Sequence, residues 1–180
     1  EDIWLERFSA LSTNFNKLNI HARHITHVLQ TLSQTLMTIC GVLVLGIGAM
    51  DKERCWPLEK FAELIKLLAT KRPDLVCCLM GAPSEKLLVD RICKYLPRDI
   101  KVVSGITKLD LGIAILARAV GFVGNDSGLL NLAAACGSPA LGIYAQSRPL
   151  DYTPNLHGVA VDESLTGKPG QIKTITAADV

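Results

Sequence analysis

A carboxylate, a hydroxyl and a glycine stand together at Asp126-Ser127-Gly128, directly after an apolar run and directly before another. If the first run is a strand and the second a helix, the triplet opens that helix. Unpaired N–H groups and the positive end of the helix dipole attract anions there. Ser127 adds a hydroxyl donor, and Gly128 lets a ligand approach the backbone closely. The pattern therefore predicts a phosphate site, although an ordinary helix cap formed by Asp126 or Ser127 stays open and is compatible with it.

Strands alternate with amphipathic helices along most of the chain. Apolar runs predict a strand with its turn at 41–49 and strands at 75–81, 100–105, 119–125 and 139–144, with a further strand-like run around His157. Helical spacing predicts helices at 57–71, 84–96, 107–117 and 127–136. The runs are continuously apolar, as in a parallel sheet covered by helices, and the alternation implies right-handed crossovers. The sequence predicts an α/β fold, a Rossmann-like parallel sheet with helices on both faces. Ligands bind such sheets at the carboxyl ends of the strands, where Asp126 is expected.

Length and composition are those of an ordinary globular domain. The chain has 180 residues, of which 49% are hydrophobic and 20% charged. The formal net charge of +2 is spread without a basic block, so we expect no nucleic-acid partner. We expect residues 41–180 to form the Rossmann-like domain. Residues 1–40, with a short helical pattern and then a connector, are predicted to be an inter-domain segment.

The composition also argues against three other classes of protein. Residues 28–50 carry no charge and are long enough to span a bilayer, but their polar residues and glycines favour a buried strand with its turn. No zinc-type spacing occurs among the cysteines, and the histidines at 21, 24 and 27 have no carboxylate or cysteine set beside them, so we expect no metal site and reduced thiols. A nicotinamide dehydrogenase is disfavoured because "GIGAMD" after the first strand lacks the third glycine of G-x-G-x-x-G.

Three segments in this order resemble the carboxy-terminal half of glycosyltransferase family nine, the ADP-heptose:lipopolysaccharide heptosyltransferases. They are "CWPLEKFAELIKLL", "CLMGAPSEK" and "VGNDSGLLNLAAACGSPALGIY". The resemblance runs from about Val42 to Tyr144. It continues at "IKTITAADV", which is similar to the start of the family's last helix, while "LERFSALSTNFNKLNI" looks like the segment that leaves its amino-terminal domain.

The resemblance implies a GT-B enzyme, in which two Rossmann-like domains face each other across a cleft. Its reaction is the inverting transfer of a heptose from ADP-heptose to the lipopolysaccharide inner core, in the cytoplasm at the cytoplasmic face of the inner membrane. The implied partners are the nucleotide-sugar donor and the lipopolysaccharide core acceptor, with no cofactor besides the donor. The general base is expected in the amino-terminal domain, which also provides any peripheral membrane contact. That domain is outside this sequence, so we expect a donor-binding module rather than a complete enzyme.

The resemblance also implies roles for individual residues. Asp126, Ser127 and Gly128 match the motif that holds the diphosphate and sugar. Glu85 matches an acid that contacts the adenosine ribose, although an ordinary first-turn helix acid remains the alternative. Arg54 stands where the family has a phosphate-binding Lys, with Lys52 able to share that task, unless both belong to a solvated charge cluster. Two further residues, Met80 and Gly81, are expected to border the adenine pocket through their backbone atoms.

Three departures from the family pattern bear on the donor. The family's His after the triplet is Asn131, which can donate a hydrogen bond but carries no charge near neutral pH. Gly-x-Thr after the fifth strand becomes Ala145-Gln146-Ser147, which adds a methyl group where bare backbone is expected, and the Lys becomes Arg54. Two alternatives therefore stay open. One is a non-catalytic or degenerate GT-B nucleotide-binding domain, and the other is a GT-B transferase that uses another nucleotide sugar.

Overall fold

The computed structural model describes residues 41–100, 102–106, 108–150 and 152–180. The predicted connector and helix over 1–40, and the three histidines in it, lie outside the described residues. The boundary predicted at residue 40 stays a prediction.

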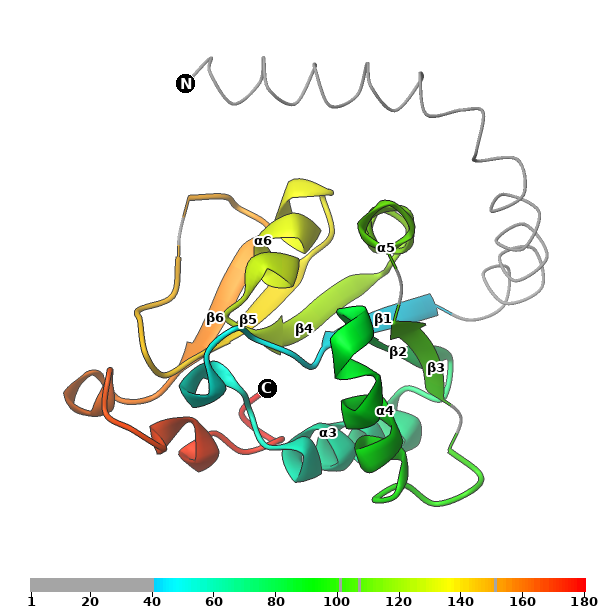
Figure 1. The fold of residues 1–180 in the computed structure, drawn as a ribbon, viewed down its shortest axis with the longest axis horizontal. Coiled ribbons are helices and arrows are strands. Elements are labelled where there is room, and N and C mark those ends of the chain that lie inside the picture. Colours follow the sequence, from blue (N-terminus) through cyan, green and yellow to red (C-terminus); the bar gives the residue numbers. More distant parts are fainter. Residues whose placement is uncertain (1–40, 101, 107, 151) are drawn as a thin grey trace, which may run out of the picture. The chain divides into compact units, whose positions relative to one another are not determined.

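Six parallel strands form one sheet in the order β3-β2-β1-β4-β5-β6 (Figure 1). The strands are β1 (Gly41–Gly46), β2 (Leu75–Gly81), β3 (Val102–Ile106), β4 (Gly121–Asn125), β5 (Ala140–Tyr144) and β6 (Leu156–Ala160). Helices α3 (Leu58–Lys71), α4 (Lys86–Cys93), α5 (Leu109–Leu116) and α6 (Gly128–Ala135) connect the first five strands in turn. The predicted Rossmann-like α/β sheet is confirmed, and the strand-like run predicted around His157 forms β6.

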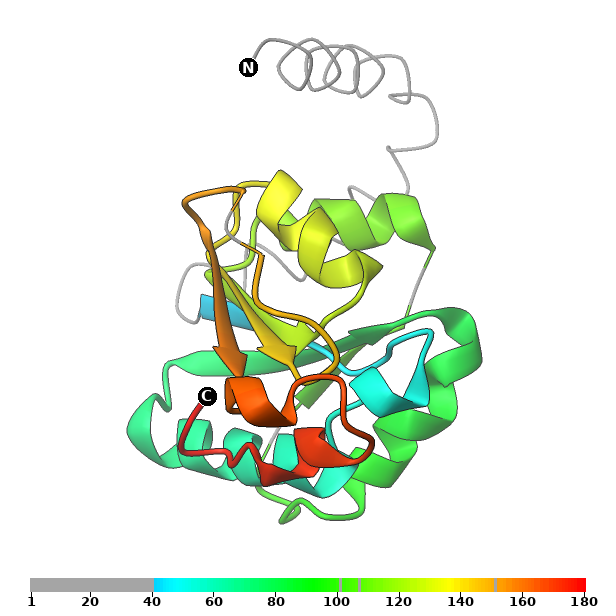
Figure 2. The same cartoon turned by 90° about the vertical axis from the view of Figure 1, so that its left-hand side faces the viewer.

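The two faces of the sheet carry separate apolar cores. On one face lie α3, α4 and the carboxy-terminal segment (Figures 1 and 2). Their buried side chains, among them Phe61, Ile65, Ile92 and Ile172, belong to one apolar core. On the other face α5 and α6 pack through Leu116 and Leu130, among others. The continuously apolar strands follow from this double cover.

Several element ends differ from the predicted ones. Within the strand and turn predicted over 41–49, the strand itself ends at Gly46, and the chain then leads into the short 3₁₀ helix Lys52–Arg54. The helix predicted over 84–96 is preceded by a 3₁₀ turn at Pro83–Glu85, and α4 itself ends at Cys93. The uncharged segment over 28–50 is described only from residue 41, where it forms β1. None of the helices in the described part of the chain is long and apolar enough to cross a membrane.

Trp56 fixes the start of α3 in the core. Its ring is 1% exposed and packs edge-on against Phe61, with ring centroids 5.0 Å apart. Its indole Nε1 donates a hydrogen bond to the carbonyl of Ile175 at 3.0 Å. The segment between β1 and α3 is thereby anchored to the carboxy-terminal part of the chain, which gives the residues just before Trp56 a fixed position.

Candidate functional site

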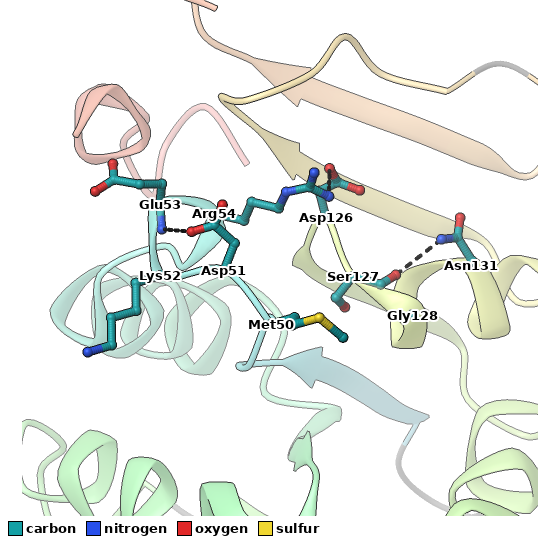
Figure 3. A pocket seen from close by; sticks show the side chains of 9 residues that line it. All are labelled: Met50, Asp51, Lys52, Glu53, Arg54, Asp126, Ser127, Gly128 and Asn131. Carbon is teal, nitrogen blue, oxygen red and sulfur yellow. Dashed lines mark hydrogen bonds and ion pairs between the residues drawn. The ribbon is translucent and has the colours of Figure 1, made fainter. Parts of the chain in front are cut away.

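A pocket of about 760 Å³ opens at the carboxyl end of β4 (Figure 3). The loop between β1 and α3 forms one side, and the start of α6 forms the other. The lining residues are Met50, Asp51, Lys52, Glu53, Arg54, Asp126, Ser127, Gly128 and Asn131. Six of the nine predicted donor-site residues, from segments far apart in sequence, therefore meet in one pocket.

Asn125 holds the two sides of this pocket together. It is fully buried, and its side-chain Oδ1 accepts a hydrogen bond from the backbone N–H of Trp56 at 2.9 Å. Its Nδ2 donates to the carbonyl of Ile47 at 3.0 Å. Because both bonds reach the segment between β1 and α3, the end of β4 fixes that segment beside the start of α6. Nothing in the sequence pattern around the triplet distinguishes this amide from an ordinary strand residue.

Asp126 forms an ion pair with Arg54 across the pocket. The Arg54 Nη1 and the Ser147 hydroxyl both donate to Asp126 Oδ2, at 3.1 and 2.9 Å (Figure 3 for Arg54). The carboxylate side chain is only 11% exposed, whereas that of Arg54 is 42% exposed. Burial makes such a pair sensitive to loss of either partner, since the charge left behind would be uncompensated. The Arg54 Nε is also buried, without a hydrogen-bond partner among the described residues.

Ser127 is the N-cap of α6, in an extended backbone conformation, yet its side chain makes no capping hydrogen bond. Its Oγ is buried and has no hydrogen-bond partner in the described part of the chain. The first amides of a helix have no intrahelical acceptor, so the start of α6 presents several free donors. A Cβ built on Gly128 would meet nothing within 4 Å, so the space in front of this backbone is open. The start of α6 can therefore accept an anion.

A second pocket, of about 520 Å³, adjoins the first and shares Met50, Ser127 and Gly128 with it. Three predicted residues, Met80, Gly81 and Glu85, line this pocket. Met80 is 1% exposed, so its side chain belongs to the core beneath the pocket. The remaining lining residues are Gly48, Ala49, Ala82, Pro83, Gly105, Lys108, Leu109, Gly112 and Leu129. Of these, the sequence analysis assigned none to the site.

The Glu85 carboxylate lies over the ends of β1 and β2. Its Oε2 accepts a hydrogen bond from the backbone N–H of Ala82 at 2.6 Å. A Cβ on Gly48 would lie 1.7 Å from Oε1, and one on Gly81 would lie 2.5 Å from Oε2. Glycine at both positions thus makes room for the carboxylate. The bond to Ala82 means that Glu85 has a local structural role, and Oε1 is the oxygen left for a ligand.

Lys52 and Asn131 occupy the margins of the first pocket. Lys52 is exposed, and its side chain points away from Arg54 and Asp126 (Figure 3). Asn131 lies one turn into α6, where its Nδ2 donates to the carbonyl of Ser127 at 3.3 Å. Of the two cations predicted to bind phosphate, Arg54 is therefore the one directed at the start of α6.

Ala145-Gln146-Ser147, which stands where the family has Gly-x-Thr, contacts the site through the Ser147 hydroxyl and not through the methyl group of Ala145. Ala145 is 2% exposed and packs in the core with Ile143, so its methyl group does not line either pocket. The Ser147 hydroxyl instead bonds to Asp126, as described above.

Burial keeps the thiols of Cys77 and Cys78 unreactive near neutral pH. It raises the pKa of both Cys77 and Cys78 to about 11. In the described part of the chain all cysteines are free, and no group of three His, Cys, Asp or Glu side chains is arranged to hold a metal ion.

Comparison with known proteins finds that this chain is similar to heptosyltransferases. The pattern of glycosyltransferase family 9 (heptosyltransferase) matches residues 12–166. Lipooligosaccharide heptosyltransferase 2 of Haemophilus influenzae is 30% identical over 105 residues, which is 56% of this chain and 30% of that protein. Lipopolysaccharide heptosyltransferase 2 of Escherichia coli is 32% identical over 117 residues, covering 62% of this chain and 33% of that protein.

Solved structures give the same result for the fold. The E. coli ADP-heptose LPS heptosyltransferase II superimposes with a TM-score of 0.72 at 21% identity, over 83% of this chain and 47% of that one. The E. coli heptosyltransferase WaaC, solved with ADP-2-deoxy-2-fluoro heptose, gives a TM-score of 0.62 at 25% identity, over 82% of this chain and 45% of that one. This chain thus spans about a third of the curated relatives and less than half of these structures.

Proposed function

Because the chain belongs to glycosyltransferase family 9, we propose that it forms the donor-binding half of a heptosyltransferase. The whole enzyme transfers a heptose from ADP-heptose to a hydroxyl of the lipopolysaccharide inner core. The observation that carries this proposal is the buried Ser127 hydroxyl, which has no partner among the described residues and stands beside the free amides of α6. The phosphate oxygens of a sugar diphosphate can accept hydrogen bonds from these unpaired donors.

The two adjoining pockets fit the two ends of such a donor. The diphosphate and sugar occupy the pocket of Arg54, Asp126 and Ser127, and the nucleoside occupies the pocket of Glu85. A carboxylate such as Glu85 is suited to accept hydrogen bonds from ribose hydroxyls, here through Oε1. The WaaC complex with an ADP-sugar analogue, a relative at 25% identity, supports adenosine diphosphate as the carrier.

Bond cleavage places new negative charge on the diphosphate. The acceptor hydroxyl oxygen bonds to the anomeric carbon as the bond from that carbon to the β-phosphate oxygen breaks, and the hydroxyl proton passes to a base outside this sequence. Free amides of α6, the Ser127 hydroxyl and the Arg54 guanidinium can stabilise the leaving diphosphate. Asp126 holds Arg54 by one nitrogen, Nη1, so the other guanidinium donors remain for the phosphates. Asp126 Oδ1 remains for a sugar hydroxyl.

Cofactor, acceptor and location follow from the same proposal. We propose that no cofactor is needed, since protein groups provide the charge that stabilises the leaving group. The acceptor is the lipopolysaccharide core, bound by the amino-terminal domain that the family resemblance implies. The enzyme then works in the cytoplasm, at the cytoplasmic face of the inner membrane.

Calorimetric titration of the chain with ADP, UDP and GDP tests the proposal. We expect ADP to bind most tightly, because the proposal places the adenosine of ADP-heptose in the second pocket. Tighter binding of UDP or GDP would favour a transferase for another nucleotide sugar. Absence of binding by all three would contradict the proposal and favour a degenerate domain, the alternative suggested by Asn131 in place of the family's His.

A further inference from the structure

The loop that joins β5 to β6 runs beside α6 and is fixed near both of its ends. Near its start, the Ser147 hydroxyl bonds to Asp126 Oδ2 at 2.9 Å. Near its end, the Asn155 Nδ2 donates to the carbonyls of Ala134 and Ser138, at 3.0 and 2.8 Å. The described residues between these anchors, which include Tyr152, are therefore held along the side of α6.

Tyr152 reaches from this loop to Asn131. Its hydroxyl donates a hydrogen bond to Asn131 Oδ1, while Asn131 Nδ2 donates to the carbonyl of Ser127. The two bonds give the amide a single orientation, because Oδ1 can only accept and Nδ2 can only donate. In Figure 3 the amide nitrogen of Asn131 is directed at Ser127, and the oxygen points away from it.

One N–H group of the oriented Asn131 amide takes part in neither of these two hydrogen bonds. An Asn Nδ2 carries two N–H groups, and the carbonyl of Ser127 accepts from one of them. Asn131 lines the first pocket together with Ser127 and Gly128 at the start of α6, so its second N–H is available to a ligand bound there. Without the bond from Tyr152, only the bond from Nδ2 to the Ser127 carbonyl would orient this exposed side chain, and its second N–H would be held less firmly.

The Tyr152 hydroxyl remains a donor at neutral pH. Partial burial, and then the nearby Asp126 carboxylate, raise the pKa of Tyr152 above its ordinary value. The phenol proton that orients Asn131 is thus retained across the physiological range.

We propose that Tyr152 is a positioning residue for donor binding, which fixes Asn131 so that its second Nδ2–H bonds to an oxygen of the sugar diphosphate. This rests on the proposed function and adds the loop between β5 and β6 to the donor site. Fixing a donor before binding raises affinity, since the side chain loses less freedom when the ligand arrives.

A double-mutant cycle tests the inference on the full chain, with ADP-heptose as the calorimetric probe. Tyr152→Phe should weaken binding by about threefold to tenfold, the usual effect of losing one neutral hydrogen bond. Asn131→Ala should weaken it at least as much. In the Asn131→Ala background, Tyr152→Phe should have no further effect, because Tyr152 acts through Asn131. Tyr95→Phe is the matched control, since its hydroxyl bonds to Glu59 in the layer of α3 and α4.

A second measurement needs no ligand. In ¹⁵N-labelled chain, Tyr152→Phe should move the two proton signals of the Asn131 side-chain amide toward the positions of a freely rotating, solvated asparagine. If wild type binds ADP-heptose but Tyr152→Phe matches it in affinity and amide signals, the inference is wrong and the proposed function stands. Equal weakening by Tyr152→Phe in both backgrounds would also overturn it. If wild type does not bind, the proposed function itself fails.

Discussion

Ser127→Ala separates the two interpretations of the triplet, because they predict effects on different quantities. A Ser that caps a helix through its hydroxyl stabilises the protein by about 0.5–2 kcal/mol relative to Ala. Ser127 makes no such bond, and its buried Oγ has no partner among the described residues. The substitution should therefore leave the free energy of unfolding unchanged or slightly higher.

The affinity for ADP should change instead. A hydrogen bond to a charged group is worth about 1.5–3 kcal/mol, so the dissociation constant of Ser127→Ala should rise by about tenfold to a hundredfold. Urea denaturation and calorimetry measure the two quantities on the same protein. Ser138→Ala is the matched control. Its hydroxyl is buried and bonds to the carbonyl of Leu116, so this variant should lose stability and keep its affinity. A Ser127→Ala protein that lost about 1 kcal/mol of stability and bound ADP normally would refute the reasoning.

The remaining predictions concern charge, backbone and thiols. Arg54→Ala should weaken ADP binding by about 1.5–3 kcal/mol, whereas Lys52→Ala, whose side chain points away, should change it by less than about 0.5 kcal/mol; calorimetry on both variants decides which cation binds. Gly137, just after α6, has a φ of +82°, so Gly137→Ala should lower the free energy of unfolding by about 1–2 kcal/mol in urea denaturation. Burial raises the pKa of Cys77 to about 11, so at pH 8 almost none of it is thiolate, and peptide mapping after iodoacetamide treatment should find it unmodified while exposed Cys93 reacts.

The sequence was most informative where a pattern is local. Apolar spacing located α3, whose Phe61 and Ile65 are buried, and the apolar run before Asp126 located β4. The ends of the helices were less predictable, since the 3₁₀ turn before α4 depends on backbone geometry that apolar spacing does not encode.

The contacts within the site could not be predicted, because they join residues that only the fold brings together. Arg54 and Asp126 are 72 positions apart, and Tyr152 and Asn131 are 21 apart. Their pairing depends on the order of the strands and on the path of the loop after β5. The resemblance to family nine pointed to segments that meet around the first pocket, but the bonds from Ser147 to Asp126 and from Tyr152 to Asn131 are seen only in the structure.

The central claim is that the diphosphate of a sugar nucleotide binds at the start of α6. A crystal structure of the chain with ADP-heptose tests this directly. We predict phosphate oxygens within hydrogen-bonding distance of the Ser127 hydroxyl and the first amides of α6, with the guanidinium of Arg54 beside them. A diphosphate bound elsewhere on the chain, with the Ser127 hydroxyl still lacking a partner, would contradict the account.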